Sequence, residues 1–436
     1  MQRFTTNSYY DDEDMIFVPS SLGGVIDFDR YDKFENILRE IIRMPEYWRM
    51  SDIAQLGFVE HDIPSAHHTR FVHCIGAFDL MRNLTYFSNR NWKKSRAKSL
   101  DFNIKERVAQ AGALLHDLGH AFPGHPFERA IKELFPQTYK NHEVWSTEII
   151  QRSGIYNKLN SYDAGFGDKV LNIMAEDDLR HSIWQQVHCG NLNVDTLDYL
   201  HRDQSRTKQY FDKTLPRRII ENVKFGKTSD GDHCVILCPG SEIDFHKMLN
   251  VRGEMYSDVY FNGASAAAEA FLPELLRRIS KCLNTQKYRF KLKNLNNPYV
   301  NFIDSGGASY ENYLNLTGDY FNSMVHRIAH LQIPGLSEFA AAYTNISGNF
   351  STSEIYHGYA DGAPDKNVIE NARDEIEGRG GVFKDISIPL YDTNKPEVYC
   401  DRGEFASPKK FSHVFPDIVN ARQRIVNGYH MKGWER

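Results

Sequence analysis

The sequence predicts a mainly α-helical fold with one small β-hairpin and an irregular α+β lobe at its C-terminal end. Apolar residues recur at helical spacing from about Tyr31 onward, first over residues 34–42. The clearest hairpin pairs 222–226 with 234–237 across the turn residues 229–232. Beyond about Ser347 the chain is rich in Gly and Asn and has few long periodic runs.

The remaining helices follow the same periodicity. Pro273 is expected to break or kink the helix that contains it, and the polar stretch 294–307 is expected to be a loop. We therefore predict an N-terminal extension over residues 1–23, flexible or strap-like, a core over 24–346 and a C-terminal lobe over 347–436. The predicted helices cover residues 68–81, 108–115, 193–200, 243–251, 256–279 and 310–331.

Composition narrows the class of protein. The chain has 436 residues, of which 41% are hydrophobic and 25% charged, as in a globular protein with a large core. Its net charge of −5 argues against a protein that coats nucleic acid, and leaves nucleic acid only as a secondary regulator. No apolar stretch approaches the roughly 20 residues of a membrane span, and the N-terminus lacks a signal-peptide core. The six cysteines are scattered through the chain, and we interpret Cys234 and Cys238 as ordinary buried thiols. This usage indicates a reducing cytoplasm.

The polar residues within the apolar runs suggest a metal site. His116 and Asp117 end the run 108–115, His73 lies in an upstream helix, and Asp195 opens a downstream one. Together they offer two nitrogen and two oxygen ligands, which suit a divalent cation such as Mn, Mg, Fe or Zn and leave positions open for water and substrate. Each residue taken singly can also be read as a satisfied polar group of the core.

The order His…His-Asp…Asp and the sequence motifs around it resemble those of the HD-domain metal-dependent phosphohydrolases. Within that family they resemble the motifs of the deoxynucleoside triphosphate triphosphohydrolases. The resemblance implies an HD-domain helical bundle, hydrolysis of a dNTP substrate to deoxynucleoside and inorganic triphosphate, and a homo-oligomer. It extends over about the first 270 residues. The matching segments are 44–50, 55–57, 64–73, 116–120, 123–128, 141–143, 194–203 and 252–256, with Tyr260.

Catalytic roles follow from the resemblance for a histidine-rich group. It implicates His125 and Glu128 in the chemical step, and one helical turn between them allows an oriented pair. His120 lies four residues after His116, hence on the same face if that helix continues. His120 can alternatively be a loop or capping residue, and His142 can belong to a helix cap at 141–143.

Substrate contacts are implied for a second group. Gln55 would bind the sugar 3′-hydroxyl with Asp203 nearby, and Tyr199 would close the sugar edge against a ribose 2′-hydroxyl. The alternatives are core packing for the tyrosines and a surface salt bridge for Arg70. Of the others, Leu56 would pack against deoxyribose or base, Arg70 and Arg252 would bind phosphate, and Tyr260 would contact base or sugar.

Three departures mark a divergent member. Thr196 stands where the vertebrate enzyme of this family has a lysine that binds phosphate. Lys208 or Lys213 would have to supply that missing positive charge. The residues 261–263 lack the His-Lys that helps bind an activating nucleotide between subunits, and 49–54 is less basic than usual. The alternatives to a triphosphohydrolase are an HD-type nucleotide phosphodiesterase or nucleotidase, and a nucleotide-sensing protein with a non-catalytic site.

Overall fold

Helices make up most of the computed structural model, which describes residues 17–93, 103–175, 182–208, 210–228, 231–401 and 409–434. The predicted mainly α-helical fold is confirmed. Residues 1–16 of the predicted N-terminal extension lie outside the described residues. The α-helices are α1 Lys33–Ile42, α2 Pro45–Trp48, α3 Arg70–Lys93, α4 Ile104–Leu115, α5 His125–Leu134, α6 His142–Arg152, α7 Gly154–Tyr162, α8 Phe166–Met174, α9 Ile183–Cys189, α10 Val194–Thr207, α11 Leu215–Glu221, α12 Ser241–Met255, α13 Gly263–Leu283, α14 Gln286–Lys293, α15 Pro298–Asp304, α16 Tyr310–Tyr313, α17 Gly318–Ala329, α18 Ser337–Ala342, α19 Ile346–Asn349, α20 Lys366–Gly378, α21 Phe411–Val414 and α22 Pro416–Asn420.

Short helical turns and strands complete the described chain. The 3₁₀ turns are η1 Arg49–Asp52, η2 Val59–His61 and η4 Ala360–Gly362, and η3 Tyr256–Tyr260 is a π-helical turn. The strands are β1 Val18–Pro19, β2 Val25–Ile26, β3 Val223–Lys227, β4 His233–Leu237, β5 Phe350–Tyr359, β6 Val382–Pro389, β7 Val398–Cys400, β8 Lys409–Lys410 and β9 Arg422–Met431.

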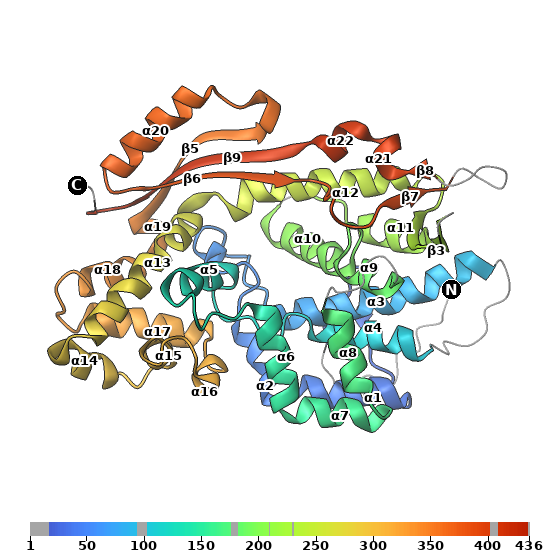
Figure 1. Ribbon diagram of the computed structural model, residues 1–436, viewed down its shortest axis with the longest axis horizontal. Coiled ribbons are helices and arrows are strands. Elements are labelled where there is room, and N and C mark those ends of the chain that lie inside the picture. The colour runs from blue at the N-terminus through green and yellow to red at the C-terminus, as the bar shows by residue number, and fades with distance from the viewer. Residues whose placement is uncertain are drawn as a thin grey trace.

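The helices are arranged around three apolar clusters. One is centred on α13 and packs it against α5, α15, α17 and α18. The second joins α3, α10 and α12 to the β3–β4 hairpin, and the third joins α1, α4, α7 and α8 to the other face of α3. In Figure 1 the strands β5, β9 and β6, with α20 outside them, run along one side of the molecule over α12 and α13.

Local capping explains where the helices near the predicted site begin. Asn103 and Glu106 form a reciprocal capping box at the start of α4. Asn141 accepts a hydrogen bond from Val144 N at the start of α6, and Asn193 accepts one from Thr196 N at the start of α10. The alternative reading of 141–143 as a helix cap therefore holds structurally, because Asn141 is the cap.

The small β-hairpin is confirmed. β3 and β4 are antiparallel, with Phe225 opposite Val235. The C-terminal part of the chain extends this sheet, because β7 pairs in parallel with β4 and β8 follows, giving the order β3–β4–β7–β8. The α+β lobe is also present, but it is more regular than we expected. Its sheet β5–β9–β6 contains two ten-residue strands, and its helix α20 has thirteen residues.

The structure differs from three local expectations, the first only in that Pro273 does not break its helix. Pro273 lies within α13 without ending it, and the interruption comes at Phe261 and Asn262, where the Asn262 side chain caps the new helix. Burial of apolar residues on both sides of Pro273 offsets the roughly 3 kcal/mol that an interior proline costs. The loop expected at 294–307 contains α15, which Asn297 caps and Pro298 begins. The helix expected at 310–331 is split into α16 and α17.

Candidate active site

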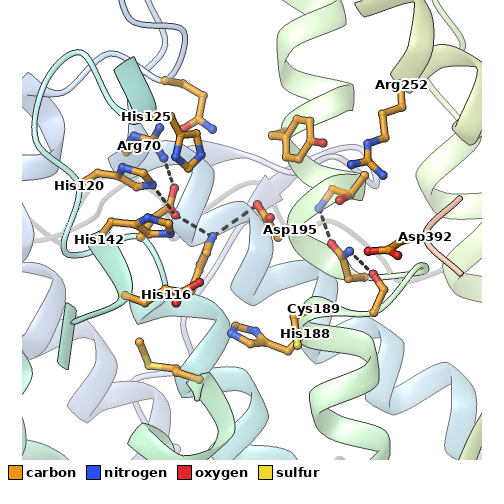
Figure 2. A pocket seen from close by; sticks show the side chains of 18 of the residues that line it. Arg70, His116, His120, His125, His142, His188, Cys189, Asp195, Arg252 and Asp392 are labelled. Atoms are coloured by element: carbon orange, nitrogen blue, oxygen red, sulfur yellow. Dashed lines mark hydrogen bonds and ion pairs between the residues drawn. The ribbon is translucent and has the colours of Figure 1, made fainter. Parts of the chain in front are cut away.

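A cavity of about 700 Å³ opens between α4, α5, α10 and α12, a size typical of ligand sites. Every site residue predicted from the sequence lines it except His73 and Glu128, which lie behind the lining. Figure 2 shows His120, His125 and His142 on one side, with Arg252, Asp392 and Cys189 on the other and Asp195 between them.

The four predicted metal ligands come from α3, from the turn that follows α4 and from α10, and they meet at the cavity wall. Nε2 of His73, on α3, lies 3.0 Å from Oδ1 of Asp195, on α10, and Nε2 of His116 lies 3.4 Å from the same oxygen. Asp117 Oδ1 lies 3.4 Å from His116 Nε2, and Asp117 Oδ2 lies 3.9 Å from His73 Nε2. The structure therefore brings all four together.

The second nitrogen of each imidazole is already engaged. Nδ1 of His73 lies 3.0 Å from Oδ2 of Asp198, and Nδ1 of His116 lies 2.9 Å from the carbonyl oxygen of Ala113. Both Nε2 atoms are buried and form no hydrogen bond of good geometry. Imidazoles oriented in this way through Nδ1 are typical of metal-ligating histidines, so the donor set fits a divalent cation.

Electrostatics at this cluster favour positive charge. Burial alone would lower the pKa of His73, but Asp195 and Asp198 outweigh it and raise that pKa to about 10. The pKa of His116 is also raised, because Asp117 and Asp195 outweigh burial. The carboxylates respond in the opposite sense, since His116 and His73 hold the pKa of Asp195 well below its usual range despite burial. A cation bound here would neutralise the carboxylates of Asp117 and Asp195.

The His-Asp pair does not lie inside a helix as the sequence suggested. α4 ends at Leu115, His116 is its C-cap, and residues 117–119 form a turn, so His120 is not on a continuing helical face. Gly119 allows this turn to lie against α6, because a Cβ there would come within 2.0 Å of the His142 carbonyl oxygen.

Buried side chains clamp the turn from behind. Arg49 donates to the carbonyl oxygens of Leu118 and His120, each at 2.9 Å, and to that of Leu314 at 2.8 Å. The hydroxyl of Tyr313 donates to the Gly119 carbonyl oxygen at 2.7 Å. These contacts fix the backbone that presents His116, Asp117 and His120 to the cavity.

The predicted catalytic residues gather around Glu128. Its Oε1 lies 3.0 Å from Nδ1 of His142, 3.1 Å from Nδ1 of His120 and 3.6 Å from Nδ1 of His125. The rings of His120 and His142 stack with centroids 4.0 Å apart. His125 differs from both, because 60% of its side chain is exposed toward the cavity. The carboxylate thus holds the buried imidazole of His120 and the partly buried imidazole of His142, and stands beside a third that faces the cavity.

Arg70 joins this histidine cluster to the metal-ligand cluster. It is buried, not on the surface, and its Nη1 forms an ion pair with Oδ2 of Asp117. Burial and the Arg70 guanidinium together lower the pKa of His120 to about 4. The pKa of His142 is raised, because its hydrogen bond to Glu128 outweighs burial. The four residues His120, His125, Glu128 and His142 also approach closely enough to hold a metal, but the adjacent guanidinium opposes a second cation.

The residues assigned to the sugar lie on the α10 and α12 side. Oδ1 of Asp203 lies 2.7 Å from Nε2 of His68, and Tyr260 donates to Oδ2 at 2.5 Å. The ring of Tyr199 lies 6.4 Å from that of His73, edge to face. Gln55 lines the cavity, and its Oε1 is buried without a hydrogen-bond partner. An unsatisfied acceptor at a cavity wall is suited to a ligand hydroxyl.

Several lining residues were missed by the sequence analysis. His188, on α9, has its ring centroid 5.9 Å from that of His116, and burial together with the charge of His116 lowers its pKa to about 4. Tyr256 lies beside Arg252 in the π-helical turn. A histidine or tyrosine at helical spacing carries no signal that separates a lining residue from a core one. The other missed residues include Asn191, Pro389, Asp392 and Lys395.

The two lysines expected to replace the missing cation at Thr196 do not line the cavity. Lys208 forms an ion pair with Asp258 at 2.5 Å, and Lys213 lies over the ring of Phe211. Both are close to Thr196 in sequence, but the end of α10 directs them away from the cavity. This expectation was wrong.

Comparison with known proteins agrees with the geometry. Residues 70–203 match the family model of the HD domain, a span that contains His73, His116, Asp117 and Asp195. A phosphohydrolase from Bacteroides thetaiotaomicron has a similar fold, with a TM-score of 0.69 over 97% of this chain and all of that one, at 20% identity. No helix among the described ranges is long and apolar enough to cross a membrane.

Sequence relatives are distant. An uncharacterized protein of Mycoplasma genitalium is 26% identical over 288 residues, covering 63% of each chain. A deoxynucleoside triphosphate triphosphohydrolase of Gallus gallus is 23% identical over 408 residues, covering 85% of this chain and 60% of the relative. The chain thus spans less than two thirds of the length of these two relatives.

Proposed function

Because residues 70–203 match the HD-domain model and carry the group of His73, His116 and Asp195 with Asp117 beside it, we propose that the chain is a metal-dependent phosphohydrolase that converts a deoxynucleoside triphosphate to deoxynucleoside and inorganic triphosphate. Distant similarity to the Gallus gallus triphosphohydrolase supports the substrate class. The nitrogen and oxygen donors of the cluster accommodate Mn, Mg, Fe or Zn.

One observation carries this proposal. The metal-ligand cluster lies at the wall of a single cavity. The same cavity is lined by a histidine that is paired with a carboxylate, and by polar side chains that can hold both a sugar and phosphates. A phosphodiesterase acting on a simple ester needs the first two features only. Gln55, Asp203 and Arg252 are the lining residues that the additional contacts to a nucleotide would use.

The chemistry can be assigned to named side chains. A divalent cation at the ligand cluster supplies charge neutralisation for the phosphate and Lewis acidity. Arg70, which already donates to Asp117, has further guanidinium donors for phosphate oxygens. His125 reaches the cavity and can give a proton to the leaving sugar oxygen, while Glu128 behind it stabilises the protonated imidazole. His120 and His142 keep Glu128 in place through their Nδ1 atoms.

Sugar selection follows from the opposite wall. The Gln55 oxygen lacks a partner, and Asp203 is fixed by His68 and Tyr260, so both can take part in binding a 3′-hydroxyl without rearrangement. Tyr199 is the aromatic ring beside the metal ligands and would stand against a 2′-hydroxyl. A packed wall of this kind discriminates because it cannot move aside without cost.

Product analysis tests the proposal. Purified protein of known metal content is incubated with each dNTP and each NTP, and products are separated by anion exchange. We expect tripolyphosphate and deoxynucleoside in equal amounts, with NTPs hydrolysed much more slowly. Release of orthophosphate or pyrophosphate, or equal rates on NTPs, would favour the nucleotidase alternative. Tight dNTP binding with no turnover at any metal would favour a nucleotide sensor.

A further inference from the structure

A segment of the C-terminal lobe, residues 389–397, forms part of the cavity wall, and we call it the wall segment. It connects β6 to β7, and three of its residues, Pro389, Asp392 and Lys395, line the cavity. Leu390 and Tyr391 anchor it, since both are buried in the apolar cluster of α3, α10 and α12. The segment is therefore a fixed part of the cavity and comes from outside the HD domain.

Hydrogen bonds tie the wall segment to the loop that precedes the metal ligand Asp195. The Asn191 amide donates to the Asp392 carbonyl oxygen and accepts from Asp392 N, both at 2.9 Å. Two residues later, Asn193 caps α10, the helix whose second residue is Asp195. The position of the wall segment is thus coupled to that of the metal cluster through one short loop.

Lys395 brings a positive charge to this wall. Its ammonium donates to the carbonyl oxygen of Cys189 at the end of α9, which uses one of its three donors. Among the described residues no carboxylate forms an ion pair with it. Its side chain lines the cavity together with His188. Arg70 differs, because it already forms an ion pair with Asp117.

We propose that Lys395 binds the terminal phosphates of the substrate polyphosphate, an inference that rests on the proposed function. A triphosphate carries several negative charges, and beside Asp195 the α10 helix offers only the neutral Thr196. Lys395 is held at the adjacent loop and has two ammonium donors left for phosphate oxygens. The C-terminal lobe thereby supplies a specificity-determining cation that α10 lacks beside Asp195.

A structural role is the competing explanation. A lysine at a helix C-terminus can simply satisfy a terminal carbonyl and the helix dipole. Lys395→Gln separates the two roles, because glutamine keeps an N–H donor for the Cys189 carbonyl but carries no charge. Lys395→Arg keeps the charge. Lys384→Gln is the matched control, since Lys384 is an exposed lysine of the same lobe that does not line the cavity.

Calorimetric binding of inorganic tripolyphosphate, a dNTP in its non-hydrolysable analogue form and a deoxynucleoside to the full chain tests the inference, with metal content measured before and after. Loss of a charged hydrogen bond predicts about ten- to hundred-fold weaker binding of tripolyphosphate and dNTP by Lys395→Gln. Deoxynucleoside binding should be unchanged, Lys395→Arg should retain most of the affinity, and Lys384→Gln should behave as wild type.

The outcomes separate this inference from the proposed function. If wild type binds dNTP and tripolyphosphate, and Lys395→Gln binds them equally well, Lys395 is only a helix cap and the inference is overturned. If Lys395→Gln loses deoxynucleoside binding to the same extent, its effect is structural and the inference is again overturned. If wild type binds neither phosphate compound, the proposed function fails with it.

Discussion

Oδ2 of Asp198 lies 3.0 Å from Nδ1 of His73, on the side of the imidazole opposite the metal-ligand cluster. The contact depends on a close approach of α3 and α10. A Cβ at Gly76 would lie 2.2 Å from Asp198 Oδ1, so only glycine lets the two helices meet at this level. Arg202 and Ser21 donate to the same carboxylate, at 2.6 and 2.7 Å. Asp198 is therefore a positioning residue for His73.

Asp198→Asn should lower metal affinity by about 10–100-fold, because it weakens the hydrogen bond that orients His73. The measurement is a competition titration with a chromogenic chelator. Asp79→Asn is the control, since Asp79 is a buried acid of α3, the helix that carries His73, and pairs with Arg82 without contacting His73. Equal metal affinity in wild type and Asp198→Asn would remove the positioning role.

His125→Ala and Glu128→Gln should each lower kcat by about 10²–10⁴-fold, the usual contribution of general acid–base catalysis. Metal content and dNTP affinity should stay near wild type, because neither residue belongs to the group of His73, His116 and Asp195. Asp195→Ala is the contrasting variant and should lose metal together with activity. A raised KM with normal kcat in His125→Ala would reassign that residue to binding.

Sugar discrimination should change in two separable ways. Gln55→Ala should reduce the preference for a 3′-hydroxyl over a 3′-deoxy analogue by roughly ten- to a hundred-fold, the worth of one unpaired buried group. Tyr199→Ala should relax exclusion of ribose and raise kcat/KM for NTPs relative to dNTPs. Steady-state kinetics on matched dNTP, NTP and 3′-deoxy substrates provide the check, and unchanged ratios in both variants would contradict the assignment.

Arg49→Met should both destabilise the protein and impair turnover, although Arg49 does not line the cavity. The substitution leaves the carbonyl oxygens of Leu118, His120 and Leu314 without their donor, at a cost of about 1–3 kcal/mol per buried group. Chemical denaturation gives the loss in free energy of unfolding, and kcat should fall because the His-Asp turn shifts. Arg43→Met, at an exposed position, should change neither quantity.

Glu269→Gln should alter how stability depends on pH. Burial raises the pKa of Glu269 to about 8, against the opposing charge of Arg129, from an ordinary value of 4.5. Between these values the folded protein holds one more proton than the unfolded chain, so stability falls as pH rises. The limit is about 1.4 kcal/mol per pH unit, reduced by the partial exposure of the carboxyl.

The measurement for Glu269 is the difference in free energy of unfolding between variant and wild type from pH 5 to 8. This difference should shift in favour of Glu269→Gln as pH rises. Glu254→Gln, at an exposed position of α12, is the control and should show a constant difference. A flat difference for Glu269→Gln would mean that the carboxyl titrates as it does in water.

Features encoded within one helix could be predicted from the sequence, and features that join distant segments could not. His73, His116 and Asp195 each stand in a local apolar pattern, and the order of these patterns resembles a family with one fold. Lys395 stands in a polar stretch, Asp392 to Pro396, that looks like any surface turn. Its role becomes visible only when β7 pairs with β4 and Asn191 bonds to Asp392, and no periodicity encodes either contact.

Some errors were avoidable. Asn297-Pro298 is a helix start signal that would have predicted α15 within the presumed loop. The end of α4 was harder to foresee, because His116 continues an apolar helical pattern and the turn is held by Arg49 from another part of the chain. Lys208 and Lys213 follow Thr196 closely in sequence, but nearness in sequence does not determine the direction of a side chain beyond a helix end.

The strand order β5–β9–β6 also determines when the cavity can be completed during synthesis. β9 is central, so β5 and β6 lack their common partner until residues 422–431 have left the ribosome. The wall segment follows β6 directly and has no anchor at that end before then. The helices that carry the metal ligands emerge much earlier and can pack as a unit while translation continues. A nascent chain can therefore assemble its metal-ligand cluster first, whereas the β6 end of the cavity wall gains its strand partner only when β9 is made.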